Sequence, residues 1–256
     1  MPKSHWLLLA TTLLLSSCSL APDSQNNNGL NFQELKINHA SVYLAEIETA
    51  KLQLQIIQNT DTHNAQNIQE IHQQNKSVFS FNGGFFSEDF HPTGLLISEG
   101  KELAPLVKAD LLDGIFTIDQ NNQPKLYSYS EFKTKRPSLQ LQFAIQNGPT
   151  LIDDQGNLAI SNKSIKKANR TALGITKDQQ LVVIIDRETI LDIDKSLTLY
   201  QFADLIKNST ELKDLGIHSV LNLDGGPSTG LIINDQYFPE LDDIQNIIIT
   251  KPRSDQ

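Results

Sequence analysis

The segment Asn222–Gly230 gathers more chemically capable groups than any other stretch of this sequence of 256 residues. It reads Asn-Leu-Asp-Gly-Gly-Pro-Ser-Thr-Gly and places an amide, a carboxylate, two hydroxyls and three glycines at the end of an apolar run. Glycines beside polar side chains let the backbone approach a ligand closely and present bare N–H groups to an anion or a sugar oxygen. The segment is therefore predicted to form part of a site, the alternative being an aspartate that caps a turn through its side chain.

Three further segments place polar residues at the end or the start of an apolar run. Asn82–Phe86 (Asn-Gly-Gly-Phe-Phe) follows one such run, and Gln146–Thr150 (Gln-Asn-Gly-Pro-Thr) repeats the order of apolar strand, Asn and Gly. Asn169–Gly174 begins beside Arg170, whose planar guanidinium suits a bidentate contact with phosphate or carboxylate. Asn-Gly also forms tight hairpin turns, and Arg170 taken alone would equally form a structural salt bridge. We expect the four segments to meet at one site.

Ser228 lies in a Gly-x-Ser-x-Gly pattern, which in α/β-hydrolases carries a nucleophilic serine. That nucleophile needs a helix directly after the serine, whereas residues 231–238 have the pattern of a strand, a turn and a second strand. A triad in that fold also needs a histidine downstream, and the last histidine of the chain is His218. A serine esterase is therefore an alternative with little support.

The overall charge and the missing motifs exclude several other functions. The net charge is −9 and the isoelectric point is near 5.1, which argues against nucleic acid as a partner because phosphate backbones favour basic surfaces. The small basic cluster around Lys163, Lys166, Lys167 and Arg170 is interpreted as a solvated surface. Phosphate loops, dinucleotide-binding turns and paired zinc ligands are absent from the sequence. No cofactor or metal is assigned, and a divalent cation beside a phosphate is left open.

The first residues have the pattern of a bacterial lipoprotein signal. A basic start, an apolar run over 6–15 and Leu15-Ser16-Ser17 precede Cys18, the only cysteine. We predict a signal peptide over 1–17, lipidation at Cys18 and a polar tether over 18–33. A buried free thiol is the alternative for Cys18. The pattern predicts a lipid-anchored protein of the bacterial envelope, with Ser19 favouring the outer membrane and its periplasmic face.

The remaining residues, 34–252, are predicted to form one strand-rich α+β domain. It has a mixed or antiparallel sheet core and a few packed helices, because short β-branched and aromatic runs alternate with Gly, Asn, Asp and Pro. Residues 42–48 and 52–57 are expected to pair as a hairpin, and helices are expected near 64–75 and 197–215. Further strands are expected at 77–82, 93–98, 114–118, 141–147, 171–176, 181–186, 219–224, 230–234 and 244–250.

Taken in order, five blocks of the sequence resemble the phosphodiester glycosidase family across about residues 35–250. In this family a third glycine often stands where this chain has Pro227. The blocks that carry the resemblance are Asn82-Gly83-Gly84-Phe85-Phe86, Pro92-Thr93-Gly94-Leu95, Asn147-Gly148-Pro149, Arg170-Thr171-Ala172-Leu173-Gly174 and Asn222-Leu223-Asp224-Gly225-Gly226-Pro227-Ser228.

The resemblance implies hydrolysis of a sugar-1-phosphodiester, which releases a free sugar and a phosphomonoester. On that reading Asp224, Arg170 and Asn222 are the catalytic candidates, with Asp224 as nucleophile or as base for water and Arg170 neutralising the phosphate together with N–H groups of the two Gly-Gly turns. The general acid is left open among Glu88, Asp89, His91 and Asp186. The substrate-binding candidates are Asn82, Gly83, Gly84, Phe85, Asn147, Gly148, Thr171, Gly225, Gly226 and Ser228.

The expected partners are a sugar-phosphate or glycolipid substrate and the membrane that holds the lipid anchor. A non-catalytic, lipid-anchored protein that binds glycans or glycolipids is the main alternative to an enzyme. The sequence does not indicate the sugar, the aglycone or the oligomeric state.

Overall fold

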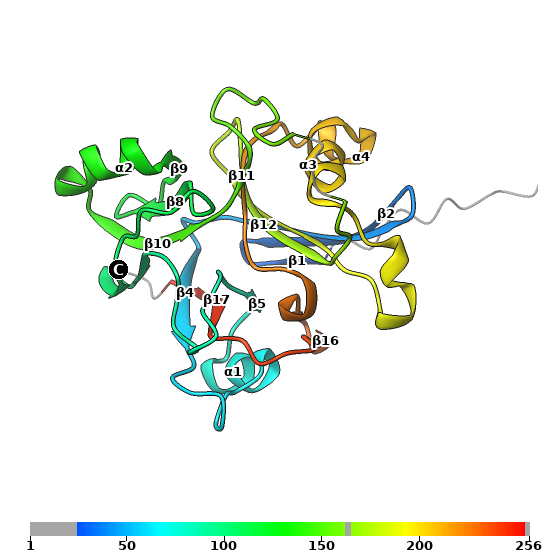
Figure 1. Cartoon of the computed structure of the whole chain (residues 1–256), viewed down its shortest axis with the longest axis horizontal. Coiled ribbons are helices and arrows are strands. Elements are labelled where there is room, and N and C mark those ends of the chain that lie inside the picture. The colour runs from blue at the N-terminus through cyan, green and yellow to red at the C-terminus, as the bar shows by residue number, and fades with distance from the viewer. Residues whose placement is uncertain (1–24, 162–164, 254–256) are drawn as a thin grey trace, which may run out of the picture.

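The computed structural model describes residues 25–161 and 165–253 (Figure 1). The predicted signal peptide, Cys18 and Lys163 lie outside the described residues. The strands are β1 (Gln25–Asn27), β2 (Leu30–Ile37), β3 (Ala40–Ile47), β4 (Leu52–Gln58), β5 (Phe79–Asn82), β6 (Leu96–Ser98), β7 (Lys101–Ala104), β8 (Gly114–Asp119), β9 (Pro124–Ser128), β10 (Leu141–Asn147), β11 (Thr150–Ile152), β12 (Arg170–Thr176), β13 (Leu181–Asp186), β14 (Ile217–Asn222), β15 (Leu231–Ile233), β16 (Gln236–Phe238) and β17 (Asn246–Pro252).

The helices are few and short, and the first turns of the three longest carry side-chain caps. Asn67 and Thr198 each form a capping box with the residue three positions later, which satisfies backbone N–H groups that a helix start leaves unpaired. The α-helices are α1 (Ile68–Asn75), α2 (Tyr129–Lys135), α3 (Leu199–Asn208) and α4 (Thr210–Lys213), and the 3-10 helices are η1 (Arg136–Ser138), η2 (Ile190–Lys195) and η3 (Gly226–Ser228).

Within the described ranges the strands form three sheets in which all paired strands are antiparallel. Their orders are β1-β2-β3-β13-β12-β14-β11, β7-β6-β10-β8-β9 and β16-β15-β5-β17-β4. One face of each sheet contributes to a shared core, which includes Leu173 from the first sheet, Phe143 from the second and Phe81 from the third. The predicted α+β class with a single strand-rich domain is confirmed.

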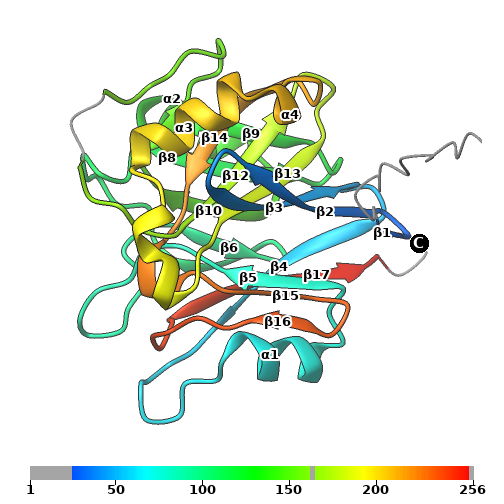
Figure 2. The ribbon, with the colours of Figure 1, turned by 90° about the vertical axis from the view of Figure 1, so that its right-hand side faces the viewer.

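Helices cover the outer faces of the sheets. Helix α3 packs Phe202 and Ile206 against the first sheet, and α2 packs Phe132 against the second. Helix α1 packs Ile68 and Ile71 against the third sheet. Figure 2 shows α3 and α4 at the top of the molecule and α1 at the bottom, with the sheets between them.

Three features differ from the sequence-based expectations. The expected hairpin of 42–48 with 52–57 is wrong: β3 pairs with β2 and β13, whereas β4 pairs with β17 in another sheet. Part of the segment expected to be a tether belongs to the fold, because β2 begins at Leu30 and Leu30 is buried. Helix α2 was not expected, and the expected helix over 197–215 is divided into α3 and α4.

Candidate functional site

The polar segments singled out in the sequence lie at one end of the sheets. Asn82, Asn147 and Asn222 are the last residues of β5, β10 and β14, whereas Arg170 is the first residue of β12. Neighbouring strands are antiparallel, so the end of one lies beside the start of the next, as the pairing of Ala172 with Asn222 shows. In Figure 2 the orange η3 turn lies at the left, and β1 and the C-terminus lie at the right.

The Asn82 side chain ties three segments together. It is buried, and its Oδ1 accepts the Thr171 hydroxyl at 2.8 Å and the Gly230 N–H at 3.4 Å. Its Nδ2 donates to the Asp224 carbonyl at 2.9 Å and weakly to the Gly83 carbonyl at 3.5 Å. Asn82 thereby fixes the backbone that carries the Asp224 carboxylate.

Asn147 and Asn222 form a second set of links at the ends of β10 and β14. The Asn147 amide accepts the Phe85 N–H at 2.9 Å and donates to the Asn222 carbonyl at 2.8 Å. The Asn222 Nδ2 donates to the carbonyls of Gly148 at 2.9 Å and Leu223 at 2.7 Å. Its Oδ1 is buried and has no hydrogen-bond partner among the described residues, which is uncommon for a buried polar atom.

A fourth amide, Asn246, was not anticipated from the sequence. It is buried at the start of β17, where its Oδ1 accepts the Gly84 N–H at 2.7 Å and its Nδ2 donates to the Gly84 carbonyl at 3.1 Å. Its main-chain carbonyl accepts the Gly83 N–H at 3.0 Å. The only available signal was an amide immediately before the apolar run 247–249.

The N–H groups of both Gly-Gly turns are therefore already bonded within the protein. Gly83 and Gly84 donate to Asn246, Gly225 donates to the Asp224 carboxylate at 2.8 Å, and Gly226 donates to the Asn169 carbonyl at 2.8 Å. The expectation that these four groups neutralise a phosphate is wrong for this arrangement. They shape the loops instead, because the glycines permit close packing.

Space explains why glycine occupies several of these positions. A Cβ on Gly83 would lie 2.9 Å from the Asn246 carbonyl and closer still to its Oδ1. A Cβ on Gly225 would lie 2.7 Å from the Asn169 carbonyl, and Gly226 adopts φ +63°. Gly148 is likewise packed against the Leu111 carbonyl. Larger residues would push the strand ends apart.

Asp224 is the carboxylate held by this framework. Its backbone N–H donates to the Gly83 carbonyl at 3.2 Å, and its Oδ1 accepts the Gly225 N–H. Burial raises the pKa of its carboxyl, which the nearby Asp242 charge raises further, while a hydrogen bond from Ser228 and the one from Gly225 lower it. A carboxyl with a raised pKa and partial burial is typical of a group that exchanges a proton or attacks a carbon.

Asp242 was not among the sequence-based candidates. It is exposed on the loop after β16, and this loop is attached to the η3 turn because the Leu241 N–H donates to the Pro227 carbonyl at 2.7 Å. The attachment places the charge of Asp242 close enough to raise the pKa of Asp224. An aspartate on a polar loop, here followed by Asp243, gives no sequence signal for such a role.

Arg170 reaches a different part of the site from the one predicted. Its Nε donates to the Leu197 carbonyl at 3.4 Å and its terminal nitrogen to the Lys166 carbonyl at 2.9 Å. Its backbone packs beside Gly225, but its guanidinium lies near Asp186, on the side where α3 begins. Burial lowers the pKa of Arg170, and two of its five N–H groups are used by carbonyls.

Asp186 is fully buried at the end of β13. Its Oδ2 accepts the Leu197 N–H at 3.2 Å, while its Oδ1 has no hydrogen-bond partner among the described residues. Burial raises the pKa of Asp186 to about 7; Glu188 raises it further, and the Leu197 hydrogen bond and Arg170 lower it. Asp186 and Arg170 together hold the Leu197 peptide group.

The other candidate acids are not brought to Asp224 by any contact in the described structure. Glu88, Asp89 and His91 are exposed on the turn that follows Phe86, where the Ser87 N–H donates to the His91 carbonyl at 2.8 Å.

Within residues 25–161 and 165–253, no group of three or more His, Cys, Asp or Glu side chains is arranged to hold a metal ion. In the same ranges, no helix has the length and apolar composition needed to cross a bilayer.

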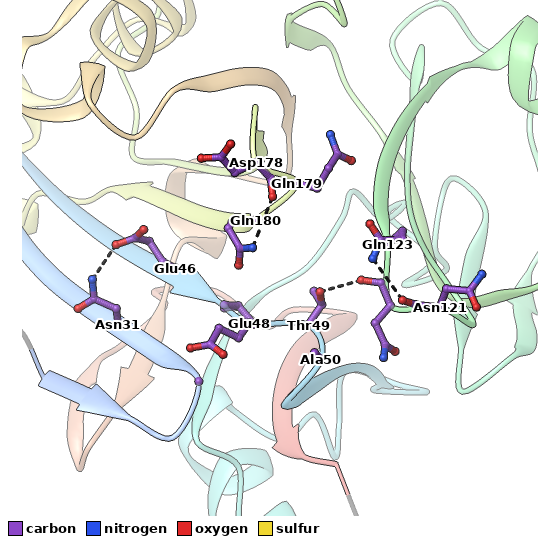
Figure 3. A pocket seen from close by; sticks show the side chains of 13 residues that line it. Asn31, Glu46, Glu48, Thr49, Ala50, Asn121, Gln123, Asp178, Gln179 and Gln180 are labelled. Carbon is purple, nitrogen blue, oxygen red and sulfur yellow. Dashed lines mark hydrogen bonds between the residues drawn. The ribbon is translucent and has the colours of Figure 1, made fainter. Parts of the chain in front are cut away.

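A separate polar cavity of about 450 Å³ lies at the opposite end of the first sheet (Figure 3). The turns 48–50, 121–123 and 178–180 line it. Glu46 there accepts a hydrogen bond from Asn31 at 2.7 Å, and the Thr49 hydroxyl donates to the Asn122 carbonyl at 2.7 Å. None of the predicted site residues lines this cavity.

The strand ends of this α+β domain thus carry a partly buried carboxylate, a partly buried arginine and an unpaired amide oxygen. The chain belongs to the phosphodiester glycosidase family, whose model matches residues 75–255. This membership confirms the family resemblance that the five blocks of the sequence carry.

Individual relatives are distant. The chain is 25% identical to YigE of Escherichia coli (strain K12), described as uncharacterized, over 164 residues that cover 61% of this chain and 58% of YigE. A hypothetical protein from Synechocystis has a TM-score of 0.66 at 15% identity, covering 92% of this chain and 65% of that chain. The chain thus spans less than two thirds of both proteins.

The fold also matches that of the zebrafish N-acetylglucosamine-1-phosphodiester alpha-N-acetylglucosaminidase catalytic domain, solved in a form auto-inhibited by its pro-peptide. The TM-score is 0.64 at 17% identity, with 93% of this chain and 86% of that chain covered. At this identity the likeness shows a shared fold.

Proposed function

We propose that the protein hydrolyses the sugar–phosphate linkage of a sugar-1-phosphodiester in the bacterial envelope. The observation that carries the proposal is the partly buried Asp224 carboxylate, which Ser228 and Gly225 bond and whose backbone Asn82 holds, within a domain of the phosphodiester glycosidase family. The raised pKa of Asp224 and its fixed position suit a group that acts on an anomeric carbon.

In the proposed reaction the bond between the anomeric carbon and the phosphate oxygen breaks. Asp224 either attacks the anomeric carbon or removes a proton from the water that does so. The phosphate leaves as a monoester, which is a good leaving group without a strong acid. Asp242, on the exposed loop beside the η3 turn, contributes a charge that raises the pKa of Asp224.

The phosphate needs a cation, and Arg170 is the proposed one. Three of its five guanidinium N–H groups are left after its contacts with the Lys166 and Leu197 carbonyls. These can stabilise the charge that grows on the leaving oxygen. The role of the other predicted binding residues is mainly to fix the loops around Asp224.

Hydrolysis in water enriched in oxygen-18 tests this mechanism. Cleavage at the anomeric carbon places the label in the sugar hydroxyl, whereas attack at phosphorus places it in the phosphate and would refute the role of Asp224. The Asp224→Asn and Arg170→Ala variants are expected to lose turnover while keeping the fold. Full turnover by both folded variants would exclude the proposed site. Retention or inversion at the anomeric carbon, measured by NMR, distinguishes nucleophile from base.

A non-catalytic protein that binds envelope glycans is the second candidate. Such a protein would bind its glycan ligand, but the wild type would release no sugar from any sugar-1-phosphodiester. The serine esterase has less support, since the Ser228 hydroxyl bonds to Asp224 and the Nδ1 of His218 contacts the Ile175 carbonyl instead. Labelling of Ser228 by an organophosphonate would revive the esterase.

We also propose that Cys18 is lipidated and becomes the new N-terminus when residues 1–17 are removed, which would hold the protein at the outer membrane facing the periplasm. The support is the sequence pattern alone. Mass spectrometry of the mature N-terminus tests it: a diacylglyceryl group on Cys18 is expected, and an unmodified thiol would refute it.

A further inference from the structure

The large apolar side chains that the described chain leaves exposed are concentrated around the candidate site. Leu111, Ile165, Ile190, Leu191 and Leu241 are each more than half exposed, with Ile165 and Leu191 at 92%. Ile193 and Val107 are exposed to 41% and 37%. We call these seven residues the apolar rim. Monomeric proteins usually scatter such residues singly over the surface, so a concentration at one end indicates a binding surface.

The first two loops of the apolar rim are attached to the site by hydrogen bonds. The loop that carries Val107 and Leu111 is held to β10, because the Val107 N–H donates to the Gln146 side chain at 3.0 Å and Gln146 donates to the Leu112 carbonyl at 3.0 Å. Gln146 directly precedes Asn147 of the site. Leu241 donates its N–H to the Pro227 carbonyl, beside η3.

The other two loops meet at Asn169. Its side chain bonds both the N–H and the carbonyl of Glu188, at 2.9 and 3.1 Å. Glu188 begins the segment that leads into η2, which carries the exposed Ile190, Leu191 and Ile193. The main-chain carbonyl of Asn169 accepts the Gly226 N–H. Ile165 precedes Lys166, whose carbonyl accepts the Arg170 guanidinium. In Figure 2 the yellow η2 segment and the orange η3 turn both lie at the left, at the same end of the sheets.

The composition of the apolar rim favours a lipid surface over a protein. It contains only Ile, Leu and Val, whereas protein interfaces are anchored mainly by Trp, Tyr and Arg in one packed patch. Its members project from four separate loops around a polar site. A lipid surface can deform to contact all four loops. Lys108, Lys166 and Lys195 stand within three residues of rim members, where their long stems can reach lipid phosphates.

Charge is not expected to drive this contact. The same loops carry Asp110, Asp192, Asp194, Asp242 and Asp243, and Lys195 forms an ion pair with Asp192 at 2.7 Å. The acidic groups therefore at least offset the basic ones. Burial of apolar side chains must supply most of the binding, which predicts weak dependence on salt and binding to zwitterionic lipid.

We propose that the apolar rim inserts into a phospholipid membrane surface and presents the site to phosphodiester headgroups of lipid-linked sugars. The substrate class rests on the proposed function, whereas the membrane contact does not. On this view the substrate is amphiphilic: its sugar phosphate reaches Asp224 while its acyl or isoprenyl chain stays in the bilayer between the loops.

The fluorescence of a tryptophan placed on the apolar rim reports whether the rim enters the membrane. The experiment uses the full chain, and its readout does not depend on how the N-terminus is anchored. The sequence has one tryptophan, Trp6, so Leu191→Trp and Leu111→Trp are made with Trp6→Phe. Phosphatidylcholine vesicles with brominated acyl chains should quench both. Gln179→Trp, in the cavity at the opposite end of the sheet, is the matched control and should not be quenched. Equal quenching at all three positions, or none, would overturn the proposal.

A second variant separates binding from chemistry. Ile190→Ser combined with Leu191→Ser is expected to lower turnover of a vesicle-embedded sugar-1-phosphodiester by about tenfold or more, because it removes two apolar side chains that the membrane contact would bury. Turnover of a water-soluble substrate should be unchanged. Equal loss on both substrates would refute the membrane contact. If the wild type cleaves neither substrate but its rim tryptophans are quenched, the proposed function fails and the membrane contact stands.

Discussion

Replacing Asn82 by alanine is expected to loosen the strand ends and the Asp224 backbone together. The side chain is buried and bonds the Thr171 hydroxyl, the Gly230 N–H and the Asp224 carbonyl. Leaving a buried polar partner unbonded costs about 1–3 kcal/mol. Because the Gly230 contact is long, we expect Asn82→Ala to lower the unfolding free energy by ~3–5 kcal/mol, a large share of the 5–15 kcal/mol of a typical domain.

Urea unfolding followed by circular dichroism measures this change, and Thr171→Val is the companion variant. It removes one of the three partners and is expected to cost ~1–2 kcal/mol. Since the two side chains contact each other, the double variant should lose about 1 kcal/mol less than the sum of the single variants. A loss below 1 kcal/mol for Asn82→Ala, or strict additivity, would show that Asn82 does not hold this framework.

Three further outcomes follow from the site. Burial raises the pKa of Asp186 to about 7, so the folded protein keeps a proton that the unfolded chain loses between about pH 4 and 7. The unfolding free energy of the wild type should therefore fall across that window relative to that of Asp186→Asn, by roughly 4 kcal/mol at most. Parallel pH profiles of the two proteins in urea unfolding would contradict this. Asp242→Asn removes a charge that raises the pKa of Asp224, so the acid limb of kcat/KM should move to lower pH, and an upward shift would count against it. Gly83→Ala should displace Asn246 and lower both thermal stability and turnover; an unchanged melting temperature would refute the packing argument.

The sequence predicted where strands end but not how they pair. Asn82 and Asn147 end their strands as expected, because an apolar run followed by Asn-Gly marks a strand and its stop. The assignment of β3 and β4 to different sheets could not be inferred. Both strands are largely buried and a short turn joins them, which is what a hairpin also requires. Helix α2 was not predicted because its sequence is polar and only Phe132 is buried.

The site was predicted as a set of positions but not as a set of roles. An asparagine side chain can bond a ligand or a neighbouring backbone equally well, and only the structure shows that Asn82, Asn147 and Asn246 bond the backbone. The direction of the Arg170 guanidinium depends on where Lys166 and Leu197 present their carbonyls. The effect of Asp242 on Asp224 depends on a loop contact that no local pattern indicates.

The position of β17 has a consequence for the order of synthesis and folding. It lies between β4 and β5, and Pro252 pairs with Leu52, so the third sheet joins residues separated by 200 positions. Asn246, which fixes the Gly83–Gly84 turn, lies on the same strand. The chain must therefore be synthesised past β17 before the turn can form. Long-range pairing of this kind slows folding. The polypeptide therefore spends longer in an unfolded state before the site forms.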